Sequence, residues 1–182
     1  MKIAIFGGSF DPPHIAHEKI AIEVLKILDI DKLIVIPTFI NPFKTKTLLQ
    51  SEIRLELLKK LFKNISNIIV SDIETSNKNP SYTKETIKKI KDIYKPTKIY
   101  FIIGSDNLEH LKTWEGFDEI NSSVTFVTIK RDGLINKNDN KMINLDLDIV
   151  NVSSTQIRDN LDLNFIPKSI KTDIKLLFKK IK

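Results

Sequence analysis

Apolar residues recur along this chain in two alternating patterns. Short apolar or β-branched runs, typical of buried strands, stand at residues 2–6, 32–36, 68–70, 98–103, 124–129 and 147–152. Apolar residues three or four positions apart predict helices over residues 15–28, 52–62, 83–94, 154–161 and 168–181. Most neighbouring strands are separated by a helix, and such crossovers join parallel strands. The pattern predicts a three-layer α/β fold, a parallel sheet with helices on both faces, as a single domain over residues 1–182.

Two stretches interrupt this alternation. Residues 38–50 and residues 130–144 are polar or irregular, and we expect both to be surface loops. In an open parallel sheet, ligands bind beyond the carboxyl ends of the strands. The motifs that carry candidate chemistry come directly after strands, so they belong to this edge.

The first motif lies between the first strand and the first helix, from Gly7 to His17, and has the sequence G-G-S-F-D-P-P-H-I-A-H. Glycine lets backbone N–H groups approach an anion, and a helix N-terminus adds positive partial charge. His14 and His17 are three residues apart and therefore share one face of the first helical turn. Two imidazoles placed there can bind a metal or donate hydrogen bonds to phosphate oxygens. A turn with two surface histidines is the alternative.

Two better-known chemistries do not fit this motif. No third nitrogen or carboxylate ligand stands at a suitable spacing from the histidines, so we predict no protein-held metal site. The motif is neither G-x-G-x-x-G nor G-x-x-x-x-G-K-[ST]. The sequence therefore disfavours a nicotinamide-dependent dehydrogenase and a kinase-type NTPase.

The second motif follows the last predicted strand and has the sequence S-S-T-Q-I-R from Ser153 to Arg158. Its hydroxyl groups can cap a helix while Arg158, about one turn later, points to the same place. Hydroxyl groups and a guanidinium at a helix N-terminus make a phosphate clamp. An ordinary capping cluster with an exposed arginine is the alternative. Arginine is scarce in this lysine-rich chain, which favours the clamp.

The composition excludes several classes of protein. The chain has no cysteine, so it has no disulfide framework, thiolate nucleophile or Cys-ligated zinc. No apolar run approaches the roughly 20 residues of a membrane span. The apolar run at residues 2–6 is too short for a signal peptide. We therefore expect a cytoplasmic location and no membrane partner.

The net charge of +6 raises the question of nucleic-acid binding. Lysine supplies most of the basic residues, they are scattered, and lysine lacks the planar fork that binds bases and phosphates bidentately. We expect no nucleic-acid partner. A positive field still favours the collection of a smaller polyanion such as a nucleoside triphosphate.

Taken together, the two motifs resemble the nucleotidyltransferase superfamily that carries the HxGH signature. The resemblance spans essentially the whole chain and implies a Rossmann-like nucleotidyltransferase fold. Within the superfamily, the chain is most similar to bacterial nicotinate-nucleotide adenylyltransferases. The segments that carry this closer similarity are Asn41-Pro42-Phe43-Lys44, Ser81-Tyr82-Thr83, Ile103-Gly104-Ser105-Asp106 and Leu111-Lys112-Thr113-Trp114.

The chain departs from the family pattern at two positions. Ala16 stands where the family usually has glycine, which adds a methyl group where the backbone comes close to the nucleotide. Phe43 stands where a histidine is common, which removes one candidate contact with phosphate or substrate. His14, His17, Lys44 and Arg158 are intact.

The resemblance implies transfer of AMP from ATP to nicotinate mononucleotide, with release of pyrophosphate and formation of nicotinate adenine dinucleotide in NAD biosynthesis. It implies that His14 and His17 contact the α- and β-phosphates, that Lys44 and Arg158 neutralise phosphate charge, and that magnesium arrives with ATP. It assigns nucleotide binding to Gly7, Gly8, Ser9, Phe10, Gly104, Asp106, Ser153, Ser154 and Thr155. It assigns the mononucleotide to backbone groups near Thr83 and to the ring of Trp114.

Several alternatives stay open. Trp114 can be a core or lid anchor, Thr83 and Asp106 can be helix N-caps, and His110 is a surface histidine. The acceptor can be the amide mononucleotide, both mononucleotides, or another phosphate such as phosphopantetheine. A nucleotide-binding protein without turnover is a further candidate. The sequence does not decide whether the chain forms a homo-oligomer.

Overall fold

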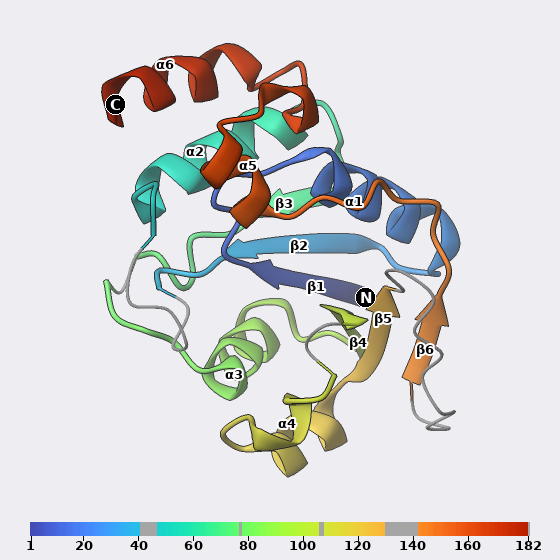
Figure 1. The fold of residues 1–182 in the computed structure, drawn as a ribbon. Coiled ribbons are helices and arrows are strands. Elements are labelled where there is room, and N and C mark those ends of the chain that lie inside the picture. The colour runs from blue at the N-terminus through green and yellow to red at the C-terminus, as the bar shows by residue number, and fades with distance from the viewer. Residues whose placement is uncertain (41–46, 77, 106–107, 130–141, 182) are drawn as a thin grey trace.

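The computed structural model describes residues 1–40, 47–76, 78–105, 108–129 and 142–181 (Figure 1). Its centre is a six-stranded sheet in which every paired strand is parallel. The strands are β1 (Lys2–Gly8), β2 (Lys32–Pro37), β3 (Ile68–Val70), β4 (Lys98–Gly104), β5 (Thr125–Ile129) and β6 (Met142–Leu145). They lie in the order β3-β2-β1-β4-β5-β6, so the chain reverses direction across the sheet between β1 and β4. Such a reversal is where open α/β sheets bind ligands.

Helices cover both faces of the sheet, as the sequence predicts. The helices are α1 (Ile15–Ile27), α2 (Ser51–Phe62), α3 (Thr83–Tyr94), α4 (Phe117–Ser123), α5 (Ser154–Asn160) and α6 (Lys171–Ile181). Figure 1 shows α1, α2, α5 and α6 on one side of the sheet and α3 and α4 on the other. The predicted three-layer α/β fold with a Rossmann-like parallel sheet is confirmed.

The alternation of side chains along the strands builds two cores. In β1, Ala4 and Phe6 join the cluster beneath α1, α2, α5 and α6. Ile3 and Ile5 point the other way and pack with α3 residues such as Ile87. Because successive strand residues face opposite sides, one continuous apolar run supplies both layers. This explains why β1 contains no polar residue between Ile3 and Phe6.

The sixth strand was predicted at the wrong place. The structure puts β6 at Met142–Leu145, inside the stretch expected to be a loop, whereas residues 147–152 form no ladder. β5 pairs with β6 from Phe126↔Met142 to Ile129↔Leu145 and then ends, so residues 147–152 meet no strand. Leu147 and Val152 are nonetheless buried in the core beneath α1 and α2, which accounts for their strand-like alternation. The apolar pattern of residues 147–152 therefore reflects the burial of these side chains, and it does not indicate a strand paired in the sheet.

The short helix α4 was not expected, and it is seven residues long. Its N-cap is Gly116, whose φ of 72° lies in the left-handed region that glycine adopts at little cost. The five predicted helices and the first five predicted strands are confirmed, to within a few residues at their ends. In the described ranges, no helix is both long and apolar enough to cross a membrane.

Candidate active site

The loop between β1 and α1 is folded tightly on itself. Phe10 has a φ of 48°, which is uncommon for a residue with a side chain, and its ring is 1% exposed. The peptide between Asp11 and Pro12 is cis. A Cβ on Gly8 would lie 3.2 Å from the Phe10 ring, closer than ordinary van der Waals contact, so a larger residue there requires the buried ring to shift. Phe10 is thus a packing residue of this loop, and its ring contacts the rings of Phe6 and His17.

The two histidines of the first motif stack on each other at the start of α1. Their ring centroids are 3.6 Å apart and their planes differ by 24°. The backbone N–H of His14, the N-cap residue, donates to Nδ1 of His17 at 3.2 Å. When Nδ1 accepts, the neutral imidazole carries its proton on Nε2 and is a donor there. The ring of Phe10 meets that of His17 edge-on, with the centroids 4.8 Å apart, and adds a second ring contact to His17.

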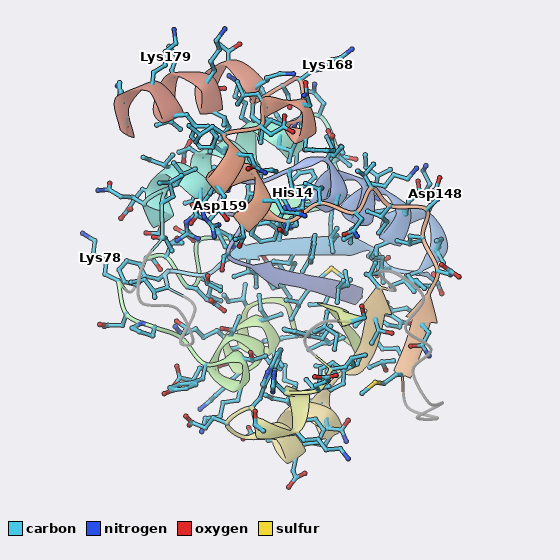
Figure 2. The ribbon with its side chains drawn as sticks, viewed as in Figure 1. His14, Lys78, Asp148, Asp159, Lys168 and Lys179 are labelled. Atoms are coloured by element: carbon cyan, nitrogen blue, oxygen red, sulfur yellow. The ribbon has the colours of Figure 1, made fainter. Side chains whose placement is uncertain are left out.

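The histidines differ in access. His14 is 1% exposed, whereas His17 is only partly buried. Figure 2 shows His14 between the sheet and α5. Ala16, the departure from the family's glycine, is also 1% exposed and packs into the apolar core. Its methyl group therefore belongs to the core in this structure.

Arg54 of α2 is a buried cation that holds three loop segments together. Its side chain is 0% exposed. Nη1 donates to the carbonyl oxygens of Ser9 (2.6 Å) and Thr38 (2.7 Å), Nη2 donates to that of Phe39 (2.7 Å), and Nε donates to that of Leu49 (3.0 Å). The guanidinium thus connects the segment after β1 with both described ends of the loop after β2. One buried guanidinium thereby serves as the donor for four backbone carbonyl oxygens.

Asp11 makes the matching connection with its carboxylate. Oδ2 accepts from the backbone N–H of Leu48 at 2.8 Å, and Oδ1 accepts from that of Leu49 at 2.9 Å. Asp11 is 3% exposed, so these are strong charge-assisted bonds in a dry setting. Burial lowers the pKa of Arg54, while the nearby Asp11 and Glu52 carboxylates raise it. The two buried charges together fix the loop after β2 against the loop after β1.

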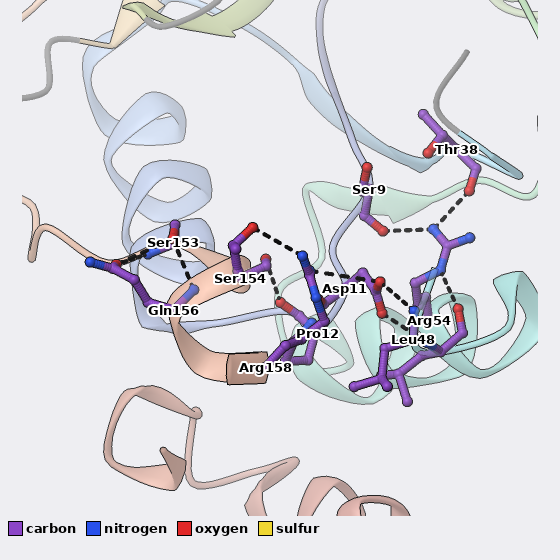
Figure 3. Close-up of polar contacts among 12 residues, drawn as sticks. Ser9, Asp11, Pro12, Thr38, Leu48, Arg54, Ser153, Ser154, Gln156 and Arg158 are labelled. Atoms are coloured by element: carbon purple, nitrogen blue, oxygen red, sulfur yellow. Dashed lines mark hydrogen bonds and ion pairs between the residues drawn. The ribbon is translucent and has the colours of Figure 1, made fainter. Parts of the chain in front are cut away.

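The second motif docks onto the first. Arg158 Nη1 donates to the carbonyl oxygen of Asp11 at 2.6 Å, and Ser154 Oγ donates to that of Pro12 at 3.0 Å. Arg158 Nη2 also donates to Thr155 Oγ1 at 2.9 Å within the same helical turn. Figure 3 shows one continuous network from the start of α5 through Arg158 and Asp11 to Arg54. Residues 147 positions apart in sequence thereby meet at one edge of the sheet.

The start of α5 is capped as the sequence predicts. Ser153 is the N-cap, its Oγ accepts from the backbone N–H of Gln156 at 3.2 Å, and Gln156 Oε1 accepts in return from the backbone N–H of Ser153 at 2.9 Å. This reciprocal capping box fixes the direction of the helix. Ser154 and Arg158 are therefore presented to the first motif from a rigid helical turn.

The predicted mononucleotide side lies at α3. Thr83 is the first residue of α3 and Tyr82 is its N-cap, so Thr83 is not the cap. Trp114 is partly buried, and its ring meets that of Phe101 edge-on at 6.1 Å. Lys84 Nζ pairs with Glu115 Oε1 at 2.7 Å, which connects the first turn of α3 with the residue after Trp114. The core and substrate roles of Trp114 are thus compatible.

Most of the predicted site residues meet at one place in the structure. The structure joins Gly7, Gly8, Ser9, Phe10, His14, His17, Ser153, Ser154, Thr155 and Arg158 at one edge of the sheet. Gly104 ends β4, the strand beside β1. Lys44, Phe43 and Asp106 lie outside the described residues. His110 is exposed, as expected of a surface histidine.

Sequence analysis missed Asp11 and Arg54. Asp11 lies within the first motif, and Arg54 lies outside both motifs, so neither motif assigns them a role. The scarcity of arginine that drew attention to Arg158 applies equally to Arg54. No group of three or more His, Asp or Glu side chains able to hold a metal occurs within the described ranges.

Comparisons with known proteins agree with this arrangement. Residues 5–160 match the family model described as cytidylyltransferase-like. A protein of Aliarcobacter butzleri named "Probable nicotinate-nucleotide adenylyltransferase" is 47% identical over 176 residues, 96% of this chain and 95% of the relative. A protein of the same name from Sulfurimonas denitrificans is 42% identical over 172 residues, 94% of this chain and 92% of the relative.

A solved structure supports the fold. Plasmodium falciparum nicotinic acid mononucleotide adenylyltransferase complexed with NaAD matches with a TM-score of 0.81 and 23% identity, over 100% of this chain and 98% of that chain. The alignments with the two sequence relatives span nearly the full length of each relative, so the similarity is not confined to one motif. This chain belongs to the cytidylyltransferase-like nucleotidyltransferases and, among them, to the nicotinate-nucleotide adenylyltransferase family.

Proposed function

We propose that this protein transfers AMP from ATP to nicotinate mononucleotide, releasing pyrophosphate and forming nicotinate adenine dinucleotide in NAD biosynthesis. The observation that carries the proposal is the docking of Arg158 and Ser154 of α5 onto the Asp11–Pro12 carbonyl groups beside His14 and His17. The docking gathers donors from both ends of the chain at the point where the sheet reverses. The family membership supplies the reaction.

The chemistry requires positioning and neutralisation of charge. The 5′-phosphate of the mononucleotide attacks the α-phosphorus of ATP in line, and pyrophosphate leaves. This phosphate is already anionic at neutral pH, so no general base and no covalent intermediate are needed. Donors fixed before the reaction stabilise the charge that develops on the bridging and leaving oxygens. ATP enters as its magnesium complex, in which phosphate oxygens and water hold most of the ion.

The two histidines take different shares of this task. His17, partly exposed and a donor at Nε2, is the residue that we assign to the phosphate oxygens. His14 donates its N–H to His17 and stacks on its ring, so it holds His17 in one orientation as well as lying near the phosphates. Arg158 has five N–H donors, and its bonds to Asp11 and Thr155 leave further donors for a phosphate oxygen. Lys44 remains part of the proposal by family resemblance alone.

The mononucleotide is placed on the α3 side. Backbone N–H groups at the start of a helix favour a carboxylate through hydrogen bonds and the helix dipole. We assign this role to the first turn of α3 near Thr83, and stacking on the pyridine ring to Trp114. The Lys84–Glu115 ion pair keeps these two parts in register.

Two substitutions test the proposal by separating the substrates. Trp114→Ala should raise KM for the mononucleotide several-fold more than KM for ATP, because it removes a stacking surface for the pyridine. His17→Ala should lower kcat by about 100-fold or more, the usual size for a lost transition-state donor. Steady-state release of pyrophosphate measures both.

His110→Ala is the matched control, because His110 is exposed and lies on the same strand-to-helix segment as Trp114. It should leave both KM values and kcat unchanged. An unchanged kcat in His17→Ala would remove the phosphate role. A larger rise in KM for ATP than for the mononucleotide in Trp114→Ala would move Trp114 to the other substrate.

A further inference from the structure

Glu74 is a buried carboxyl group to which the proposed chemistry gives no role. It lies between β3 and α3 and is 8% exposed. Oε1 accepts a hydrogen bond from Thr86 Oγ1 at 2.6 Å, and Thr86 is 3% exposed. An exposed carboxylate would be solvated and unremarkable. A buried one must be neutral or closely compensated, because low-dielectric surroundings disfavour the charge.

Its hydrogen-bond partner belongs to the first turn of α3. The backbone N–H of Thr86 donates to the carbonyl oxygen of the N-cap, Tyr82, and Thr86 is three residues beyond Thr83. The Glu74 carboxyl therefore lies against the turn that, under the proposed function, receives the mononucleotide carboxylate. Glu74 and a carboxylate bound there would therefore both lie at this turn of α3.

Glu74 changes charge close to neutral pH. Burial raises its pKa to about 7, while the Thr86 hydrogen bond and the charge of Lys89 act in the opposite direction. Lys89 lies on α3, and Lys84, in the first turn of the same helix, is paired with Glu115. Glu85, the acidic residue in the first turn of α3, is exposed to solvent. Glu74 is thus the described acid at this turn that solvent does not screen.

We propose that Glu74 is a positioning and specificity residue, which in its neutral form keeps the first turn of α3 receptive to a substrate carboxylate and on ionisation weakens binding of the acid mononucleotide but not of the amide. This inference rests on the proposed function. A neutral Glu74 leaves the positive end of the helix uncompensated. An ionised Glu74 places a second negative charge behind the same N–H groups, and the repulsion acts through poorly screened protein.

The acid and the amide form an internally controlled pair. Titration of the two histidines and of the substrate phosphate affects both mononucleotides alike, and it cancels in the ratio of their dissociation constants. Trp114 is the only tryptophan in the chain, so quenching of its fluorescence reports binding without turnover. The readout thus needs neither ATP nor catalysis.

The experiment titrates nicotinate and nicotinamide mononucleotide from pH 6 to pH 8.5 into the unsubstituted protein, Glu74→Gln and Glu85→Gln. We expect the ratio of Kd for the acid to Kd for the amide to rise about tenfold with pH in the unsubstituted protein. Glu85→Gln, which removes a solvent-screened carboxylate from the same turn, should retain this rise. Glu74→Gln should hold the ratio at its low-pH value throughout, and its Kd for the acid at pH 8.5 should be about tenfold lower than that of the unsubstituted protein.

A ratio that is flat with pH in the unsubstituted protein would overturn the inference without any variant. The same conclusion would follow if the rise persisted in Glu74→Gln. Turnover of the acid with a flat ratio would leave the proposed function standing and remove only the role of Glu74. Binding of neither mononucleotide at any pH would overturn the proposed function and this inference with it.

Discussion

Side chains that would touch no substrate hold much of the geometry of this site. Arg54 and Asp11 connect the loops after β1 and β2 through backbone groups, and both are almost wholly buried. The buried ring of Phe10 packs edge-on against His17. At the scale of single residues, the site is a set of donors held in place by buried neighbours.

Replacing the guanidinium of Arg54 should damage both stability and ATP binding. Arg54→Met keeps the length and apolar stem but leaves four carbonyl oxygens without their donor. Breaking such a buried polar network costs about 3 kcal/mol or more. We expect a lower midpoint in urea unfolding and a KM for ATP raised by about tenfold, because the loop carbonyls are free to turn toward the phosphates.

A core variant of α6 separates the two effects of Arg54→Met. Ile174→Ala removes a fully buried side chain from α6 and should cost a similar amount of stability without changing KM for ATP. If folded Arg54→Met bound ATP with unchanged KM, Arg54 would be a stabilising residue only.

Glu74 should also make stability depend on pH. Its ordinary pKa is 4.5 and the folded protein raises this to about 7, through burial. Between these values the unfolded chain has lost the proton and the folded chain keeps it, so stability falls as pH rises and levels off above pH 7. The full cost is about 3 kcal/mol.

Glu74→Gln has no group to ionise at this position, so it does not lose stability in this way as the pH rises. Its Tm should exceed that of the unsubstituted protein by an amount that grows from pH 5 to pH 7.5. Thermal unfolding across this range measures the difference. Glu85→Gln should show no such trend because Glu85 is exposed. A constant difference between Glu74→Gln and the unsubstituted protein would show that Glu74 is ionised throughout.

At the scale of elements, the β1–α1 loop places the Phe10 ring in contact with His17 and close to Gly8. A Cβ on Gly8 would press on the Phe10 ring at 3.2 Å, and Phe10 contacts His17. Gly8→Ala should therefore displace His17 and lower kcat by about tenfold or more. Pyrophosphate release gives kcat, and urea unfolding gives the accompanying change in stability.

Gly7→Ala is the matched variant for stability, because its Cβ would meet only the tip of the Phe101 ring at 4.0 Å. It should be less destabilising than Gly8→Ala. Equal kcat for Gly8→Ala and the unsubstituted protein would mean that Phe10 yields without moving His17.

Element prediction succeeded where periodicity and burial coincide. Ile87 and Ile90, which belong to the apolar spacing that predicts α3, are 3% and 0% exposed. The pattern failed at residues 147–152, which are buried in part but have no strand beside them. It also missed α4, which follows Trp114 and starts at a left-handed glycine. Pairing partners and short capped helices depend on contacts that a local pattern does not contain.

At the scale of the molecule, the sequence predicted the two motifs that form the site. It did not predict the contacts that hold the surrounding loops together. The two motifs were recognised, and their meeting at one edge follows from a parallel sheet. The links through Asp11 and Arg54 could not be predicted, because they run to backbone carbonyl and N–H groups that every residue carries.

Basic side chains are spread over the surface, and Figure 2 shows Lys78, Lys168 and Lys179 extending from separate parts of it.

The measurement that tests the central claim most directly is pyrophosphate release from ATP and magnesium with three acceptors in parallel. The acceptors are nicotinate mononucleotide, nicotinamide mononucleotide and phosphopantetheine. The account predicts rapid release with the acid, slower release with the amide at pH 7, and none with phosphopantetheine. Release with phosphopantetheine and not with the acid would contradict the proposed substrate. No release with any acceptor would contradict the proposed reaction and favour a nucleotide-binding protein without turnover.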